Sequence, residues 1–270
     1  MSRLGIIAGG GGLPRKLIDA CRRDQRPFFV LGFKGQTEGA LLQNTEHAWT
    51  KLGATTEAIA ILKSNGVDTL VMAGNIRRPS LTEMKPDLRT MQVFAKLGLA
   101  ALGDDKLLKA VSQELEKDGF KIIGAHEVEP GLLTPEGILG KLFPPNECKT
   151  DVEFGIIVTK TLGKLDIGQA AVVQQGVVLG IEAIEGTDAL LERCRKLKRK
   201  GRGGVLVKSC KPQQDRRLDL PAIGLRTVRK AFEAGLSGIA VESGASLLLD
   251  REEVINAADK LGLFIVGFRA

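Results

Sequence analysis

Short apolar runs alternate with amphipathic stretches along the first half of this 270-residue chain. The strand-like runs occupy residues 3–9, 27–33, 67–74 and 120–128, and the helix-like stretches occupy residues 13–24, 55–66 and 106–119. In the first helix-like stretch, Leu13, Leu17 and Cys21 fall on one side of the helix. Strands separated by helices predict an α/β fold with a parallel sheet, whose ligand crevice lies at the carboxyl ends of the strands.

The pattern breaks between residues 130 and 150, which contain four prolines and three glycines. We therefore predict a linker at 131–150, between an N-terminal domain at 1–130 and a C-terminal domain at 151–270. The C-terminal part reads as two strands around a Gln-Gln-Gly turn, then a helix at 187–200, a strand at 203–210 and two helix-to-strand units at 227–244 and 252–268. A hairpin followed by such units predicts a second α/β domain with a mixed sheet.

Composition and charge limit the class of protein. With 43% hydrophobic and 26% charged residues the chain has the composition of a soluble globular protein, and we expect it in the cytoplasm because it shows neither a signal peptide nor an apolar run long enough to span a membrane. The four cysteines are far apart in sequence and predict reduced thiols. The net charge of +7 implies an anionic partner, which leaves phosphorylated substrates, nucleic acid and membrane surfaces open.

Four glycines follow the first predicted strand, in the stretch AGGGGLP at residues 8–14. Backbone amides of such a loop approach phosphate groups closely, and a helix start behind them attracts anions. Pro14 stands where a dinucleotide fingerprint needs its third glycine, residues 32–34 lack the acidic residue that would bind a ribose, and no Walker sequence is present. These departures disfavour an NAD(P)-dependent oxidoreductase. Contact with a phosphate or sugar and a plain tight turn both remain open.

Three further motifs follow predicted strands or precede helices in the N-terminal half. Asn75 and Arg77 lie in AGNIRRP at the end of a strand, where they either bind a ligand or form a turn. Asp104 and Asp105 precede a helix, and a helix N-cap is favoured over a metal site. For His126, in GAHE, a structural hydrogen-bonding role and a functional role are both open.

The C-terminal half carries more charge near its predicted strand ends. Glu182 ends a strand, and Gly186, Thr187 and Asp188 open a helix whose amides either bind a phosphate or are capped. The irregular segment 206–224 holds a carboxylate among cations: Lys208, Lys211, Arg216, Arg217 and Asp219. Cations that neutralise phosphate oxygens beside a carboxylate suit phosphoryl chemistry, and a solvated loop is the alternative.

Residues 193–202 contain seven lysines or arginines in ten positions. A solvated helix face, a nucleic-acid site and a surface for anionic lipid headgroups are all open. Tyrosine is absent and there is one tryptophan, so base stacking is disfavoured and we expect no nucleic-acid partner. A membrane surface is the preferred partner, and a non-catalytic basic module that binds membranes or RNA remains a rival interpretation.

The motifs taken together resemble one enzyme family. AGGGGLP, AGNIRRP, GDD, GAHE, LDIGQAAVV, EAIEGTDALL, KPQQDRRLDLPAIG and LGLFIVG occur in the order seen in the UDP-2,3-diacylglucosamine diphosphatases of lipid A biosynthesis, of the two-domain magnesium-dependent kind. The Asp/His/Asn metal clusters of the metallophosphoesterase kind are missing. The resemblance covers nearly the whole chain.

This resemblance implies a Rossmann-like N-terminal domain, a C-terminal catalytic domain and hydrolysis of the substrate's pyrophosphate. Water attacks the α-phosphorus, and UMP and 2,3-diacylglucosamine 1-phosphate leave. It implies that Asp219 is the catalytic carboxylate, which binds Mg²⁺ or orients the water, with Asp104, Asp105 and Glu182 as secondary metal candidates. The residues implied along the substrate are Gly10, Gly11, Asn75, Gln169, Gly186, Thr187, Asp188, Lys208 and Lys211. A peripheral site on the inner membrane and a homo-oligomer stay open.

Overall fold

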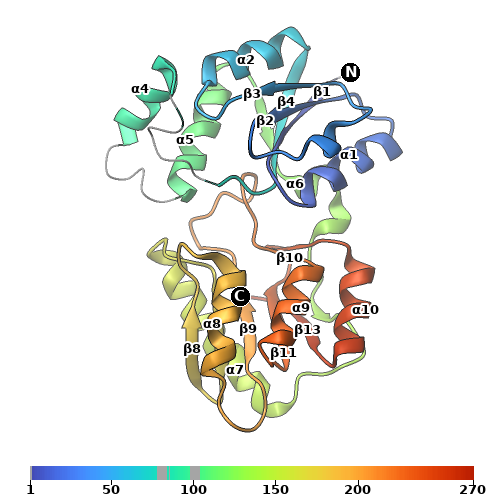
Figure 1. The fold of residues 1–270 in the computed structure, drawn as a ribbon, viewed down its shortest axis with the longest axis vertical. Coiled ribbons are helices and arrows are strands. Elements are labelled where there is room, and N and C mark those ends of the chain that lie inside the picture. The colour runs from blue at the N-terminus through green and yellow to red at the C-terminus, as the bar shows by residue number, and fades with distance from the viewer. Residues whose placement is uncertain (1, 78–83, 85, 98–103) are drawn as a thin grey trace. The chain divides into compact units, whose positions relative to one another are not determined.

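The chain forms two compact α/β units, each with its own sheet (Figure 1). The computed structural model describes residues 2–77, 84, 86–97 and 104–270. Unit 1 comprises Met1–Gly131 and Asp215–Asp219, and unit 2 comprises Leu132–Gln214 and Leu220–Ala270. A short segment distant in sequence therefore belongs to the N-terminal unit.

Unit 1 is built on a parallel sheet, as the sequence predicts, but with five strands, because His47–Thr50 add a strand that was not predicted. Its strands are β1 (Arg3–Ala8), β2 (Phe28–Phe33), β3 (His47–Thr50), β4 (Val67–Ala73) and β5 (Lys121–Ile123). They follow the order β3-β2-β1-β4-β5, which is that of a doubly wound sheet whose strand order reverses beside β1. The strand expected at 120–128 is shorter, because Ala125–Val128 form the helical turn α6.

Helices cover both faces of this sheet. The helices of unit 1 are α1 (Leu13–Arg23), α2 (Thr55–Ser64), α4 (Leu88–Leu97), which packs against α2 and α5, and α5 (Asp104–Lys117), with short 3₁₀ turns at Gly39–Leu42 (η1) and Pro130–Leu132 (η3). On one face α2 and α5 pack against β1, β2, β4 and β5 through a cluster that includes Leu62, Leu70 and Leu115. On the other, α1 contacts β1 and β4. Leu218, from the distant segment Asp215–Asp219, is buried in the cluster between the sheet and helices α2 and α5.

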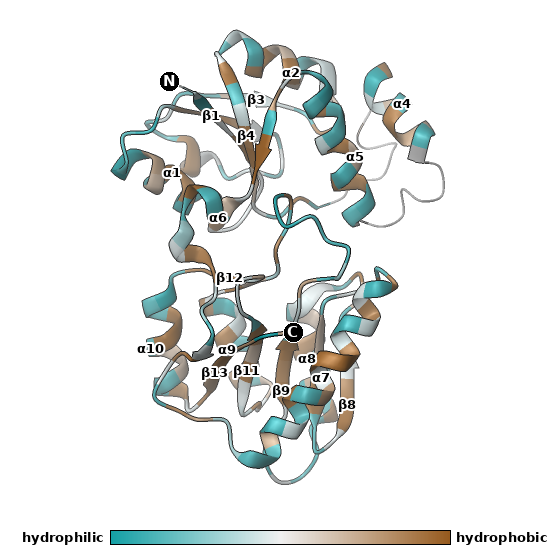
Figure 2. Ribbon diagram, turned by 180° about the vertical axis from the view of Figure 1, so that it is seen from behind, coloured by the Kyte–Doolittle hydropathy of each residue, from teal (hydrophilic) through white to brown (hydrophobic). Residues whose placement is uncertain are grey.

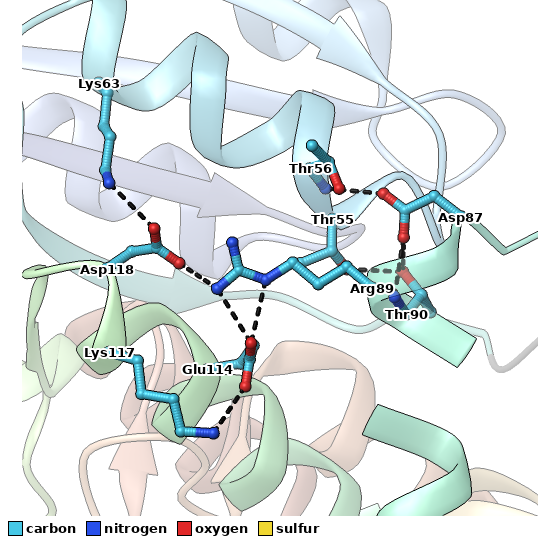
Figure 3. A network of polar contacts seen from close by, with 9 residues as sticks. All are labelled: Thr55, Thr56, Lys63, Asp87, Arg89, Thr90, Glu114, Lys117 and Asp118. Atoms are coloured by element: carbon cyan, nitrogen blue, oxygen red, sulfur yellow. Dashed lines mark hydrogen bonds and ion pairs between the residues drawn. The ribbon is translucent and has the colours of Figure 1, made fainter. Parts of the chain in front are cut away.

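One carboxylate in unit 1 joins the starts of two helices (Figure 3). Asp87 precedes α4, and its Oδ1 accepts the Thr90 N–H at 2.8 Å, while its Oδ2 accepts the Thr56 N–H in the first turn of α2 at 2.8 Å. Burial opposes ionisation, but these bonds and the one from the Thr90 hydroxyl outweigh it and hold the pKa of Asp87 at about 2. A single negative charge thus satisfies amides at two positive helix ends.

Arg89, two residues further on, connects α4 to α5 (Figure 3). Its guanidinium donates to Glu114 at 3.0 Å and also to Asp118, which Lys63 of α2 contacts at 2.9 Å. Lys117 pairs with Glu114 at 2.8 Å. The charged groups of this network tie three helices together.

Unit 2 is built on a six-stranded mixed sheet, also as predicted. Its strands are β6 (Gly137–Ile138), β7 (Ala170–Gln174), β8 (Val177–Ile181), β9 (Val205–Lys208), β11 (Gly238–Glu242) and β13 (Phe264–Phe268), in the order β6-β13-β11-β9-β7-β8. β9, β11 and β13 are parallel, whereas β7 runs antiparallel to both of its neighbours. Two further short strands, β10 (Ala222–Ile223) and β12 (Leu247–Leu248), pair with each other.

The segment expected as a linker at 131–150 contributes to this unit. β6 pairs antiparallel with β13, and Leu139 is buried in the core beside that strand. Part of this segment therefore belongs to the sheet and its core, whereas Phe143 is exposed.

Helices enclose the second sheet on both faces. They are α7 (Asn146–Lys164), α8 (Gly186–Leu197), α9 (Leu225–Glu233) and α10 (Arg251–Leu261). The last three share one core, while α7 packs Cys148 and Val152 against Val205 and Val207 on the other face. Figure 2 shows the apolar residues concentrated in β9 and β11 of this sheet. α7 was not predicted from the sequence. None of the described helices has the length and hydropathy needed to cross a bilayer.

Candidate functional site

At the carboxyl edge of the unit 1 sheet, the loops after β1 and β4 are in direct backbone contact. The Gly10 N–H donates to Asn75 O at 2.8 Å, and the Asn75 N–H donates to Gly10 O at 2.9 Å. A Cβ on Gly9 would lie 2.5 Å from Asn75 O, and one on Gly74, whose φ is +91°, would lie 2.5 Å from Gly10 O. Glycine is required at both positions because the two chains meet main chain to main chain.

A third loop, after β2, joins this edge. The Gln36 side chain accepts the Arg77 N–H at 2.8 Å and donates to Arg77 O at 3.1 Å. Thr37 donates its hydroxyl to Ala8 O at 2.5 Å. Sequence reasoning missed both Gln36 and Thr37, although their place just after the second strand was a usable signal.

The glycine loop leads into α1, whose N-cap is Gly12 with no side-chain hydrogen bond to the helix start. The first amides of a helix have no intrahelical acceptor, so this loop presents N–H groups that can bind an anion. The structure thus brings Gly10, Gly11 and Asn75 together: Gly11 has a φ of +85°, and a Cβ on it would lie 3.8 Å from Asn75 Nδ2. Their role in binding substrate stays a prediction.

The other candidates of the N-terminal half lie elsewhere in unit 1. Asp105 is buried within α5 and pairs with Lys109 at 3.1 Å, while the side chain of Asp104 lies outside the described part of the structure. His126 Nδ1 is buried with no hydrogen-bond partner among the described residues. In the part of the chain that is described, no three His, Cys, Asp or Glu side chains gather as a metal site.

Asp219 belongs by its contacts to unit 1, whereas the sequence places it in the C-terminal domain. Leu218 beside it is only 6% exposed. Arg217 donates to Asp215 at 2.7 and 3.1 Å and to Glu116 of α5 at 2.8 Å. The bonds from Arg217 hold the pKa of Asp215 below its ordinary value. The segment is therefore anchored just before Asp219, whose side chain is exposed.

At the carboxyl edge of the unit 2 sheet, four residues form a chain of polar contacts. Lys208, at the end of β9, is 7% exposed and donates to Thr187 Oγ1 at 3.0 Å and to Ala222 O at 3.0 Å. Thr187 donates to Glu182 Oε1 at 2.5 Å, and Glu182 Oε2 accepts the Gln169 N–H at 3.2 Å. We call Lys208, Thr187, Glu182 and Gln169 the edge cluster.

Strand direction explains why these residues meet. β8 and β9 both end at this edge, and β7, antiparallel to them, begins there just after Gln169. The edge cluster was named from the sequence, and the structure brings its four members together. Gly186, with a φ of +79°, begins α8 directly before Thr187. By contrast, Asp188 pairs with Arg226 of α9.

The edge cluster has unused hydrogen-bonding capacity. An ammonium has three N–H donors, and the two contacts of Lys208 leave one for a ligand. Gln169 Oε1 is buried and has no hydrogen-bond partner among the described residues. Buried polar atoms are normally satisfied, so a cation with a spare donor and an unpaired amide oxygen in one cluster suit a ligand that carries both an anionic group and a hydrogen-bond donor.

A second group of charges lies at this edge, and of its members only Lys211 was singled out from the sequence. Glu242, at the end of β11, accepts the Lys160 ammonium at 2.7 Å and the Cys210 N–H at 2.8 Å. Lys211 pairs with Asp166 at 2.6 Å. Since Lys160 belongs to α7, these contacts fix the start of the irregular segment to that helix. Glu242 could have been found, because it follows a predicted strand.

The cysteines agree with the expectation of reduced, inert thiols. Burial raises the pKa of the Cys21, Cys148 and Cys194 thiols, which keeps them protonated near neutral pH.

The fold defines an α/β protein, and the candidate ligand-binding groups lie at the carboxyl ends of its strands. Residues 3–132 match the LpxI N-terminal domain model, and residues 135–266 match the LpxI C-terminal domain model. The chain is 43% identical over 274 residues to the UDP-2,3-diacylglucosamine pyrophosphatase LpxI of Caulobacter vibrioides, an alignment that covers 99% of this chain and 98% of that protein. The chain belongs to the LpxI family.

Proposed function

We propose that this protein hydrolyses the pyrophosphate of UDP-2,3-diacylglucosamine to UMP and 2,3-diacylglucosamine 1-phosphate in lipid A biosynthesis. The observation that carries the proposal is the edge cluster, in which the buried Lys208 keeps an N–H donor and Gln169 keeps a buried acceptor. The match to LpxI along the whole chain and the name of the Caulobacter relative support this substrate.

The binding roles follow from what each edge offers. Amides at Gly10 and Gly11, with the side chain of Asn75, bind polar groups of the nucleotide or sugar. Lys208 and Lys211 neutralise phosphate oxygens, and Thr187 and Gln169 orient the substrate through hydrogen bonds. The Asp188–Arg226 pair and the Asp105–Lys109 pair have no such role in this proposal.

Asp219 is the proposed catalytic carboxylate. Its exposed side chain holds the attacking water in line with the α-phosphorus, so that the P–O bond to the sugar phosphate breaks and UMP takes up the water oxygen. Leu218 and Arg217, both anchored in unit 1, restrict the movement of the backbone that carries Asp219.

The residues present fit Mg²⁺ held largely by the substrate. Mg²⁺ keeps several waters and binds through one or two carboxylates plus phosphates, which agrees with the exposed Asp219 and with the absence of an acidic cluster among the described residues. Both Glu182 oxygens already accept hydrogen bonds, so Glu182 is the weaker ligand candidate. When bound, Mg²⁺ would supply positive charge to the diphosphate.

The test is to incubate the purified protein with UDP-2,3-diacylglucosamine and Mg²⁺ in ¹⁸O-labelled water. We expect UMP that carries the label and an unlabelled sugar phosphate. Label in the sugar phosphate would contradict attack at the α-phosphorus, and nicotinamide-cofactor binding without hydrolysis would favour the oxidoreductase instead.

The variant Asp219→Asn tests the carboxylate. We expect hydrolysis to fall by about 10²- to 10⁴-fold, the usual range for loss of a group that positions or deprotonates the nucleophile. Asp24→Asn, at an exposed carboxylate after α1, is the matched control and should retain full activity. Circular dichroism and urea midpoints equal to those of the wild type exclude misfolding, and full turnover by Asp219→Asn would refute its role.

A further inference from the structure

The helix α7 carries several large apolar side chains on the side that faces away from its sheet, although Ile156 packs against the core on the sheet side. Its sheet-facing residues are small or modest in size: Cys148, Val152, Gly155, Thr159 and Gly163. A Cβ on Gly155 would lie 2.4 Å from Val207 Cγ2, so the helix packs closely because this side is small. Its outer side, at helical spacing, includes Thr150, Phe154, Ile157, Thr161 and Leu165, with the exposed Glu153 and Lys164 beside them. Phe154, Ile157 and Leu165 are 37%, 63% and 67% exposed.

The apolar strip continues to the edge cluster. Ile167, 44% exposed, follows α7 and leads to Gln169, and Ile184, fully exposed, follows Glu182. The two loops touch, because a Cβ on Gly168 would lie 2.0 Å from Glu182 O. Large apolar side chains exposed in one continuous region mark an interaction surface in a soluble domain.

The other end of the strip meets the basic loop after α8. Arg202 pairs with Glu147 in the first turn of α7 at 3.0 Å. The backbone of the same loop is held by the β7–β8 turn, where Gln175 donates its side-chain amide to Lys200 O at 3.0 Å and its N–H to Asp151 of α7 at 3.0 Å. Arg199 and Lys200 are exposed beside this contact.

We propose that the outer side of α7, together with the basic loop 198–202, docks the protein onto an anionic lipid bilayer. We name Phe154, Ile157, Leu165, Arg199 and Lys200 the docking surface. Apolar side chains that enter the headgroup region next to cations that attract anionic lipids are the two contributions to peripheral membrane binding. A second copy of the chain is a poorer occupant, because its net charge is also +7.

This inference rests on the proposed function, since a diacyl substrate has to be taken from a bilayer. The strip ends beside the edge cluster, so docking brings the proposed phosphate-binding groups close to the headgroups of the membrane. The sequence left the role of the basic run 193–202 open. In this proposal only its last part, the loop 198–202 beside α7, binds lipid.

The first experiment is co-sedimentation of the full chain with phosphatidylcholine vesicles that contain, or lack, phosphatidylglycerol. We expect binding that needs the anionic lipid and weakens with salt. Ile157→Glu should lower the affinity about tenfold or more, because it places a charge in the headgroup region and removes an apolar side chain. The double variant Arg199→Glu, Lys200→Glu should lower it to a similar extent. Phe232→Ser, 49% exposed on α9 across the sheet, is the matched control and should bind like the wild type.

Activity separates this proposal from the proposed function. Ile157→Glu should hydrolyse detergent-dispersed substrate at the wild-type rate and vesicle-embedded substrate more slowly. Hydrolysis in detergent without vesicle binding overturns the docking surface alone, and vesicle binding without hydrolysis overturns the function alone. If light scattering shows a wild-type dimer that Ile157→Glu dissociates while vesicle binding is absent, the strip is an interface between copies and the proposal is wrong.

Discussion

The carboxyl edges of the two sheets present different chemical groups. In unit 1 the two glycine-containing loops of the edge meet through main chain: Gly9, Gly10 and Gly74 allow them to touch, and Asn75 pairs with Gly10 through backbone atoms. In unit 2 the edge consists of charged side chains, with Lys208 and Glu182 both almost fully buried. The ends of the strands, where α/β sheets usually bind ligands, thus present backbone amides in unit 1 and charged side chains in unit 2.

Unit 1 places its charges differently. Its network around Arg89 and Asp87 connects helices, and Arg89 and Asp87 are half-buried (Figure 3). Substitutions at the unit 1 edge should therefore act through sterics and stability, and those at the unit 2 edge through electrostatics and activity. The predictions below test this division.

The largest effect is expected at Lys208. Lys208→Met removes the cation but keeps most of the side chain's volume, so we expect hydrolysis to fall by about 10²- to 10³-fold, as on loss of one preorganised donor to a transition state. Steady-state assays with UDP-2,3-diacylglucosamine measure it. Lys117→Met, at a lysine whose side chain is 60% exposed in unit 1, is the control and should change little. Equal losses of activity in Lys208→Met and Lys117→Met would contradict the assignment of electrostatic effects on activity to the unit 2 edge.

The next effect is steric and concerns Gly74. Gly74→Ala forces a Cβ against Gly10 O at a φ of +91°. We expect it to destabilise unit 1 by about 2–4 kcal/mol, the combined cost of a strained backbone and overpacking. Urea unfolding gives the value, and hydrogen exchange shows whether unit 1 alone loosens. Gly12→Ala, whose Cβ would meet nothing within 4 Å, should leave the midpoint near that of the wild type. If both variants unfold alike, close approach of the loops is not what Gly74 provides.

The sequence predicts most of the fold because the strands are apolar runs and most helices have one apolar side. α7 was missed for a physical reason: Gly155 and Gly163, poor helix formers, face the sheet, while Phe154 and Ile157 face outward. Its periodicity is therefore the reverse of what an amphipathic helix shows.

The candidate site was predictable where residues follow strands. Asn75 and Glu182 came from that rule, and Glu242 would have come from it too, whereas Lys208 came from the charges of the segment 206–224. Lys160 could not be singled out from the sequence, because its helix, α7, was not predicted. The grouping of Asp219 with unit 1 depends on where Leu218 is buried, a long-range packing choice that no local pattern encodes.

A smaller effect is expected at Asp87, which connects two helix starts in unit 1. Asp87→Ala leaves the Thr56 and Thr90 amides without their acceptor, and we expect a loss of about 1–2 kcal/mol in the free energy of unfolding, the usual cost of removing a helix cap. Asp87→Asn keeps an acceptor and should lose less. Catalytic rates at neutral pH should stay near wild type in both, because the effect is on helix ends and not on the edge cluster.

The smallest effect is the pH dependence that the same carboxyl group imposes. Its pKa is about 2 in the folded protein against 3.8 for the unperturbed group, so the folded state favours the charged form. A lowered pKa gives stability that is fully present above the unfolded value and is lost as pH falls through the folded one. Because Asp87 is only half-buried, solvent screening limits this contribution to about 1 kcal/mol. Urea midpoints recorded from pH 5 to pH 2 should fall less steeply in Asp87→Asn than in the wild type, and parallel curves would show that Asp87 does not carry the acid sensitivity of unit 1.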